Sequence, residues 1–209
     1  MRIDPDFDRR RPSSEGKAFV YVLPLRSEEL LKLGFSRDPA VRMQSLHARY
    51  FEFFDLDRVF VIETDRVREA RRMESELKRA IEIHRAPAPL EVSWQARGET
   101  EWYRGAYASL CAAARELAQR GFSVRPGNSW LRDRLLARSG DLYEWSLLVF
   151  EQMRLAHDPT ELVHRATLAA TLRDRLDALT AVDIDVAQCT PVDVVDWYCA
   201  LGRNDVRGQ

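Results

Sequence analysis

Three side chains early in the chain have types and positions that suit phosphodiester hydrolysis. Tyr21 stands within an apolar run at residues 19–23, Lys32 within a second run at residues 30–35, and Arg42 follows shortly after. A phenol can take a proton from water once a nearby cation lowers its pKa. A guanidinium can bind two phosphate oxygens at once. The sequence therefore offers a base, a cation to tune it and a phosphate ligand.

Two short strands are expected to bring Tyr21 and Lys32 together. Residues 18–23 are β-branched and aromatic, as in a buried strand, and residues 30–35 form a second strand. Their connection is short enough for an antiparallel hairpin. Side chains interact across paired strands, so Lys32 is expected to supply the cation that tunes Tyr21. The chain contains only three lysines, which are Lys17, Lys32 and Lys78.

The following residues predict helices packed around this hairpin. Asp38 suits a helix N-cap, and the proline after it suits the first helical position, so a helix is expected over residues 39–49. A third strand is expected at 56–62, a long charged helix at 64–84 and an Ala-rich helix at 105–120. The expected fold class is α/β of the α+β kind. It has a small three-stranded antiparallel sheet flanked by helices, followed by an all-α C-terminal bundle.

Three regions are expected along the chain. Residues 1–16 lack an apolar period and are expected to form a flexible arm. Residues 17–125 are expected to form the α/β domain, and residues 126–209 a helical C-terminal domain. The boundary is placed in the segment 121–128, which contains a Pro-Gly pair. C-terminal helices are expected at about 129–138, 141–156, 159–179 and 190–201.

Composition narrows the class of protein without identifying it. The formal net charge is −1, yet residues 1–126 hold 23 Lys and Arg against 20 Asp and Glu, and residues 127–209 hold 9 against 13. The front half is therefore mildly basic and the back half acidic. No apolar run is long enough to span a bilayer, and no secretory signal pattern begins the chain. Three scattered cysteines suggest neither a disulfide framework nor a metal pair, so a cytoplasmic location with no membrane partner is expected.

The order and spacing of the early motifs resemble the GIY-YIG nuclease superfamily. The resemblance rests on Phe-Val-Tyr-Val-Leu at 19–23, Leu-Lys-Leu-Gly at 31–34 and Asp-Pro-Ala-Val-Arg at 38–42. It covers about residues 17–120 and is nearest to the branch of phage and bacterial open reading frames. Phe19 and Lys32 depart from the usual glycine and tyrosine of the family motifs.

The resemblance implies a metal-dependent endonuclease that hydrolyses DNA. It assigns Tyr21 as general base, Lys32 as the tuning cation and Arg42 as the group that stabilises the transition state. Glu101, which precedes an aromatic pair, resembles the family glutamate that begins a late helix and holds one Mg²⁺ or Mn²⁺. Glu99 is its rival for that position.

Further residues are expected to act around this site. Glu99 and His47 are candidates for indirect roles through the residues that touch the metal, although a surface role for His47 is equally open. Basic side chains could track a DNA backbone, or simply form a solvated helix face. These candidates are Arg37, Arg68, Arg71 and Arg72.

Two other functions stay open at this point. The departures at Phe19 and Lys32 are compatible with a catalytically inactive module that binds nucleic acid or protein. The acidic helical half is expected to bind a protein partner or to self-associate, and a regulatory adaptor in which the α/β part is only a scaffold remains a third alternative.

Overall fold

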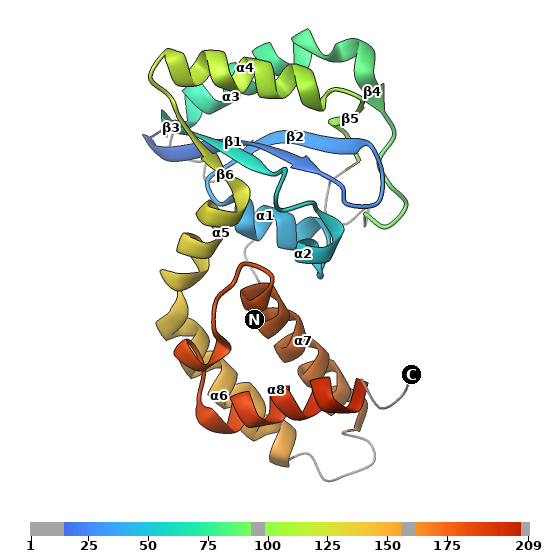
Figure 1. Cartoon of the computed structure of the whole chain (residues 1–209), viewed down its shortest axis with the longest axis vertical. Helices are drawn as coiled ribbons and strands as arrows, with labels where there is room; N and C mark the ends of the chain where they lie inside the picture. Colours follow the sequence, from blue (N-terminus) through green and yellow to red (C-terminus); the bar gives the residue numbers. More distant parts are fainter. Residues whose placement is uncertain (1–14, 93–98, 156–161, 206–209) are drawn as a thin grey trace, which may run out of the picture.

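The computed structural model describes residues 15–92, 99–155 and 162–205. Most of the expected N-terminal arm, residues 1–14, lies outside this part of the chain. The first strand, β1 (Glu15–Pro24), begins inside the segment assigned to the arm. Figure 1 shows a sheet with helices on both faces and, beside it, a group of C-terminal helices.

The sheet is antiparallel and six-stranded, in the order β4-β5-β2-β1-β3-β6. β1 and β2 (Leu30–Ser36) form the expected hairpin, whereas β3 (Phe60–Arg66) begins later than expected. The expected count of three strands is wrong because three short strands extend both edges of the sheet. These are β4 (Arg85–Ala86), β5 (Trp102–Arg104) and β6 (Ser123–Pro126). Strands this short carry no alternating pattern of their own.

Helices cover both faces of the sheet in Figure 1. On one face lie α3 (Val67–Ala80) and α4 (Tyr107–Gln119). On the other lie α1 (Pro39–Leu46) and the single turn α2 (Tyr50–Phe53). Asp38 caps α1 as expected, with Oδ1 accepting a hydrogen bond from Val41 N at 3.3 Å. The helix expected over 39–49 is shorter in the structure, because α1 ends at Leu46 and α2 begins only at Tyr50.

The C-terminal region is helical, as expected. Its helices are α5 (Gly127–Leu136), α6 (Ser139–Leu155), α7 (Leu162–Thr180) and α8 (Val192–Asp205), and a short 3₁₀ turn (Val186–Gln188) precedes α8. Another 3₁₀ turn (Glu82–His84) follows α3. In the described ranges, no helix is both long and apolar enough to cross a bilayer.

Two hydrophobic cores form on the two faces of the sheet. Alternate residues of β1 separate them, since Val20 and Val22 face α3 and α4 while Tyr21 and Leu23 face α1 and α2. The core that contains Tyr21 and Leu23 continues without a break into the C-terminal helices, where it includes Trp130 and other buried residues. The α1 side of the sheet therefore shares its core with the helical half.

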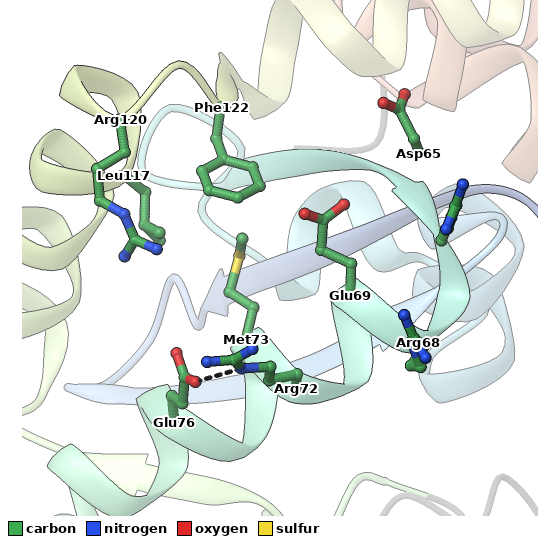
Figure 2. Close-up of a pocket in the computed structure, with 10 residues that line it drawn as sticks. Asp65, Arg68, Glu69, Arg72, Met73, Glu76, Leu117, Arg120 and Phe122 are labelled. Atoms are coloured by element: carbon green, nitrogen blue, oxygen red, sulfur yellow. Dashed lines mark hydrogen bonds and ion pairs between the residues drawn. The ribbon is translucent and has the colours of Figure 1, made fainter.

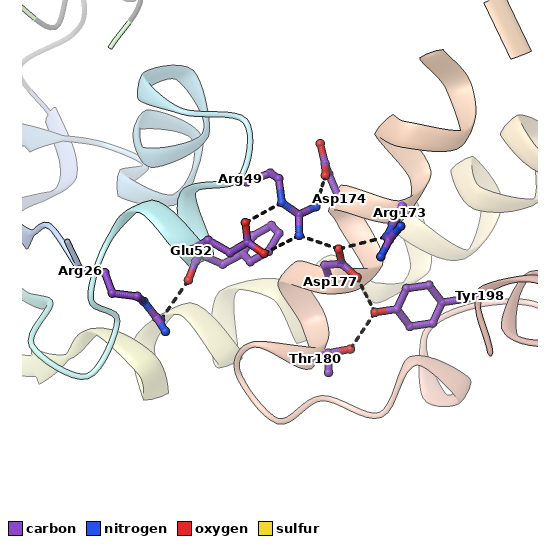
Figure 3. Close-up of polar contacts among 9 residues, drawn as sticks. Arg26, Arg49, Glu52, Arg173, Asp174, Asp177, Thr180 and Tyr198 are labelled. Atoms are coloured by element: carbon purple, nitrogen blue, oxygen red, sulfur yellow. Dashed lines mark hydrogen bonds and ion pairs between the residues drawn. The ribbon is translucent and has the colours of Figure 1, made fainter. Parts of the chain in front are cut away.

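Polar contacts reinforce this junction, as Figure 3 shows. Arg49, just before α2, forms ion pairs with Asp174 and Asp177 of α7. Tyr198 of α8 donates a hydrogen bond of 2.6 Å to Asp177 Oδ1. Close to the start of α1, Arg134 Nη2 lies 2.6 Å from Asp38 Oδ2. The helical half thus contacts both helices on this face of the sheet.

Candidate active site

Tyr21 lies at the centre of the hairpin, where its ring covers Gly34. The two residues are directly opposed in the β1–β2 ladder, and Tyr21 is 2% exposed. A Cβ atom at position 34 would lie 2.4 Å from the Tyr21 Oη atom and 2.6 Å from its Cζ atom. No real side chain tolerates such distances, so only glycine lets the phenol occupy this position.

Arg42 approaches the same hydroxyl from α1. Its guanidinium is within hydrogen-bonding reach of the Tyr21 hydroxyl, and its Nη1 also lies 3.3 Å from Ser45 Oγ. Burial has the largest effect and raises the pKa of Tyr21 above its ordinary value, whereas the charge and the hydrogen bond of Arg42 lower it in part. Among the described cations, Arg42 is therefore the one that acts most strongly on Tyr21.

Lys32 shares the Tyr21 face of the sheet and is 1% exposed. Its Nζ donates a hydrogen bond of 2.6 Å to the Thr100 carbonyl and lies 3.9 Å from Glu101 Oε2. It also lies 5.2 Å from the centre of the Trp102 ring. Burial lowers the pKa of Lys32 to about 8, although Glu101 opposes this change. Lys32 therefore joins the hairpin to the segment that carries Glu101.

Glu101 does not begin a helix, contrary to what the sequence resemblance implied. It lies just before β5, while α4 begins at Tyr107. Its φ angle of 74° is in the left-handed region, and its carbonyl accepts a hydrogen bond of 3.2 Å from Leu33 N. The backbone is thus pinned to β2 in a strained conformation, with the carboxylate one-third exposed beside Lys32.

Two residues of α3 that sequence reasoning missed complete the site. Glu74 is 6% exposed, and Lys78 lies between it and Glu101. The Lys78 Nζ atom is 2.8 Å from Glu74 Oε1 and forms an ion pair with Glu101 Oε1. Burial raises the pKa of Glu74, while the hydrogen bond from Lys78 lowers it. Glu74 also interacts electrostatically with both Tyr21 and Lys32.

A comparison against known protein families assigns part of the chain. Residues 18–118 match the T5orf172 domain. It is a GIY-YIG-like domain of phage open reading frames, so the resemblance seen in the sequence is confirmed at that level, while the C-terminal part stays unassigned. No curated protein and no solved structure matches the chain.

Two carboxylates of the T5orf172 domain, those of Glu74 and Glu101, suit a hard divalent cation. Within the described residues no group of three or more His, Cys, Asp or Glu side chains could hold a metal ion. However, Mg²⁺ is commonly held by only one or two carboxylates and keeps several waters. Glu74 and Glu101 share one cationic partner, Lys78, so their oxygens already converge on a positive charge. The pair therefore fits the metal that a GIY-YIG-like domain implies.

The two residues expected to act indirectly lie in different surroundings. His47 follows α1 and stacks on Phe53, with ring centres 4.6 Å apart. Its Nδ1 atom is buried without a hydrogen-bond partner in the described part of the chain. Glu99 is exposed, two residues before Glu101.

The expected DNA-contacting arginines of the T5orf172 domain are all exposed but fall into two groups. Arg71 lies 5.7 Å from the centre of the Phe35 ring at the end of β2, and Arg37 follows that strand. Arg68 and Arg72 line an open cavity of about 670 Å³ between α3 and α4, together with Arg66 and Arg120 (Figure 2). Acidic side chains also line this cavity, and Arg72 Nε lies 2.8 Å from Glu76 Oε1.

The buried Lys32 gives a measurable dependence of stability on pH. Its pKa is about 8 in the folded protein and 10.5 as a free side chain, so the unfolded chain binds more protons between these values. We expect the free energy of unfolding, relative to a Lys32→Met variant, to rise by up to about 3 kcal/mol across this window. Urea unfolding of both proteins from pH 7 to 10.5 measures it. A difference that stays constant with pH would show that burial does not penalise the ammonium.

Proposed function

We propose that this protein is a metal-dependent endonuclease that hydrolyses DNA phosphodiester bonds. The observation that carries the proposal is a continuous set of interactions that links a phenol, a guanidinium, two ammonium groups and two carboxylates. These groups come from β1, β2, α1, α3 and the residue before β5. Their chemical types match what phosphodiester hydrolysis needs, namely proton removal from water and stabilisation of negative charge.

The residues of this site have separate roles in the proposal. Arg42 binds non-bridging oxygens of the scissile phosphate, because a guanidinium suits two oxygens at once. Tyr21 accepts the proton of the attacking water in its ionised form. Burial raises the pKa of Tyr21 overall, and the charge and hydrogen bond of Arg42 oppose this and favour the ionised form. Lys32 adds positive charge and fixes the Thr100 carbonyl, and with it the backbone that leads to Glu101.

Glu74 and Glu101 would hold the divalent cation, Mg²⁺ or Mn²⁺. A cation there would stabilise negative charge on the phosphate and on the departing oxygen. The burial of Glu74 supports this role, since a carboxylate buried among charged groups is a frequent feature of functional sites. DNA is the proposed substrate. Arg37 and Arg71 near the end of β2, and Arg68 and Arg72 at the cavity between α3 and α4, are the proposed backbone contacts.

Incubation of the purified protein with supercoiled plasmid tests the proposal. We expect relaxed and then linear DNA to appear in Mg²⁺ or Mn²⁺, and excess EDTA to stop the reaction. Cleavage that persists at full rate in EDTA would show that the reaction does not need a divalent cation. Retarded but intact plasmid would favour the second candidate, an inactive module that binds nucleic acid.

A specific contact favours that second candidate. Phe19, which stands where GIY-YIG motifs usually have glycine, packs edge-on against Trp130 of α5 at 5.4 Å between ring centres. Helix α5 therefore lies against β1 only two residues from Tyr21, on the same face of the sheet. If this contact restricts the approach of DNA to Tyr21, the domain would bind nucleic acid without cutting it.

The helical half is proposed to interact with a protein partner or a second copy of the chain. Support comes from apolar side chains of α6 that face solvent, including Tyr143 and Leu148. Arg134 of the helical half contacts Asp38, which caps α1. Because Arg42 lies on α1, this contact also supports a role of the helical half in holding Arg42 in place.

A further inference from the structure

Lys78 occupies the space between the two carboxylates of the candidate metal site. It lies one helical turn after Glu74 on α3, so the two side chains meet on the same face of the helix. Its ammonium lies 2.8 Å from Glu74 Oε1 and is ion-paired with Glu101 Oε1. Glu101 comes from a different part of the chain, so the ammonium is what joins the two carboxylates.

We propose that Lys78 is a built-in competitor of the divalent cation, which must displace its ammonium to reach Glu74 and Glu101. This inference rests on the proposed function, because it takes these two carboxylates as the metal ligands. The Lys78 ammonium already neutralises part of the negative charge of the two carboxylates. Each carboxylate oxygen that it contacts is not available to the metal. Lys78 therefore lowers the affinity of the site for Mg²⁺ and Mn²⁺.

The two lysines that contact Glu101 differ in their freedom to move away from it. Lys32 is 1% exposed and hydrogen-bonded to the Thr100 carbonyl, so it is fixed within the core. The Lys78 side chain is 22% exposed, and its four-carbon stem allows the ammonium to swing towards solvent. The Lys78 ammonium can therefore move away when a metal binds, while Lys32 remains beside Glu101 with and without the metal.

The opposite role is also chemically reasonable and gives the opposite result. An ammonium between two carboxylates can hold them together and so prepare a metal site before the cation arrives. In that case removal of Lys78 would loosen the carboxylates and weaken binding. If Lys78 competes, its removal leaves the two carboxylates with no shared counter-ion. A divalent cation then interacts with both carboxylates without first displacing an ammonium.

Mn²⁺ binding to the full-length protein tests the proposal. We expect Lys78→Gln to bind Mn²⁺ about tenfold more tightly than the wild type, as measured from the free-ion signal in electron paramagnetic resonance. Arg72→Gln is the matched control. Arg72 lies on the same helix, forms an i,i+4 ion pair with Glu76 and is 82% exposed. Its loss changes the net charge equally but removes the partner of Glu76 and not the partner of Glu74 and Glu101. Affinity of Lys78→Gln equal to that of the control, or lower than wild type, would overturn the proposal.

A second measurement needs no substitution. Amine acylation of the wild-type protein, read by mass spectrometry, reports separately on the three lysines. We expect Mg²⁺ to increase labelling of Lys78 several-fold, because its ammonium leaves the carboxylates, while labelling of the exposed Lys17 stays constant. Unchanged or reduced labelling of Lys78 at saturating Mg²⁺ would contradict displacement. Neither experiment measures DNA cleavage, so a protein that binds metal without nicking plasmid would refute the endonuclease and leave this inference standing.

Discussion

Tyr21→Phe should reduce the single-turnover rate of DNA cleavage by about 10²- to 10⁴-fold, the usual contribution of a positioned acid–base group. The substitution removes only the hydroxyl that Arg42 contacts. The ring still fills the space over Gly34, so the free energy of unfolding should change little. The measurement is cleavage of a labelled duplex with enzyme in excess, in Mg²⁺.

Tyr50→Phe is the control for this prediction. Tyr50 is also a buried tyrosine, and burial raises its pKa to about 12. However, its side chain lines a pocket between α1 and the C-terminal helices, away from Gly34. We expect Tyr50→Phe to cleave at nearly the wild-type rate. A Tyr21→Phe rate within threefold of wild type would show that the phenol takes no proton in the reaction.

Gly34→Ala should abolish cleavage through the position of Tyr21. The new Cβ atom would lie 2.4 Å from the Tyr21 hydroxyl oxygen, so either the ring or the hairpin must move. Forcing an extra methyl group into a packed core typically costs about 1–3 kcal/mol. We therefore expect both a lower free energy of unfolding and the loss of cleavage, with DNA binding through the exposed arginines retained.

Gly140→Ala is the matched control for this substitution. Gly140 lies in α6, and a Cβ atom there would meet no heavy atom within 4 Å. Alanine favours a helix more than glycine does, so this variant should be at least as stable as the wild type and fully active. Full activity of Gly34→Ala would mean that Tyr21 need not lie over the hairpin.

The hairpin and its acid–base groups were predictable from the sequence because local chemistry dictates them. Alternation in β1 places Tyr21 on one face and Val20 and Val22 on the other. The Asp-Pro pair sets the start of α1, and with it the position of Arg42. These features depend on neighbouring residues, so a single sequence contains the information.

Glu74 and Lys78 could not be assigned from local pattern alone. α3 is heavily charged, and most of its charged residues face solvent. A signal was present, since Glu74 falls on the buried side of the helix with Ala70 and Leu77. A carboxylate in the apolar stripe of an amphipathic helix needs a partner, but the partner comes from distant residues. The resemblance likewise misplaced Glu101, because only the tertiary pairing of β5 with β2 shows that a strand follows it.

The central claim is that Glu74 and Glu101 hold a divalent cation next to Tyr21 and Arg42. Crystals soaked in Mn²⁺, at a concentration that supports plasmid nicking, test it through anomalous diffraction. The account predicts one strong peak between the two carboxylates, on the side that faces the Tyr21 hydroxyl, with the Lys78 ammonium moved away. A map without a peak at these carboxylates, or with the only peak elsewhere on the protein, would contradict it.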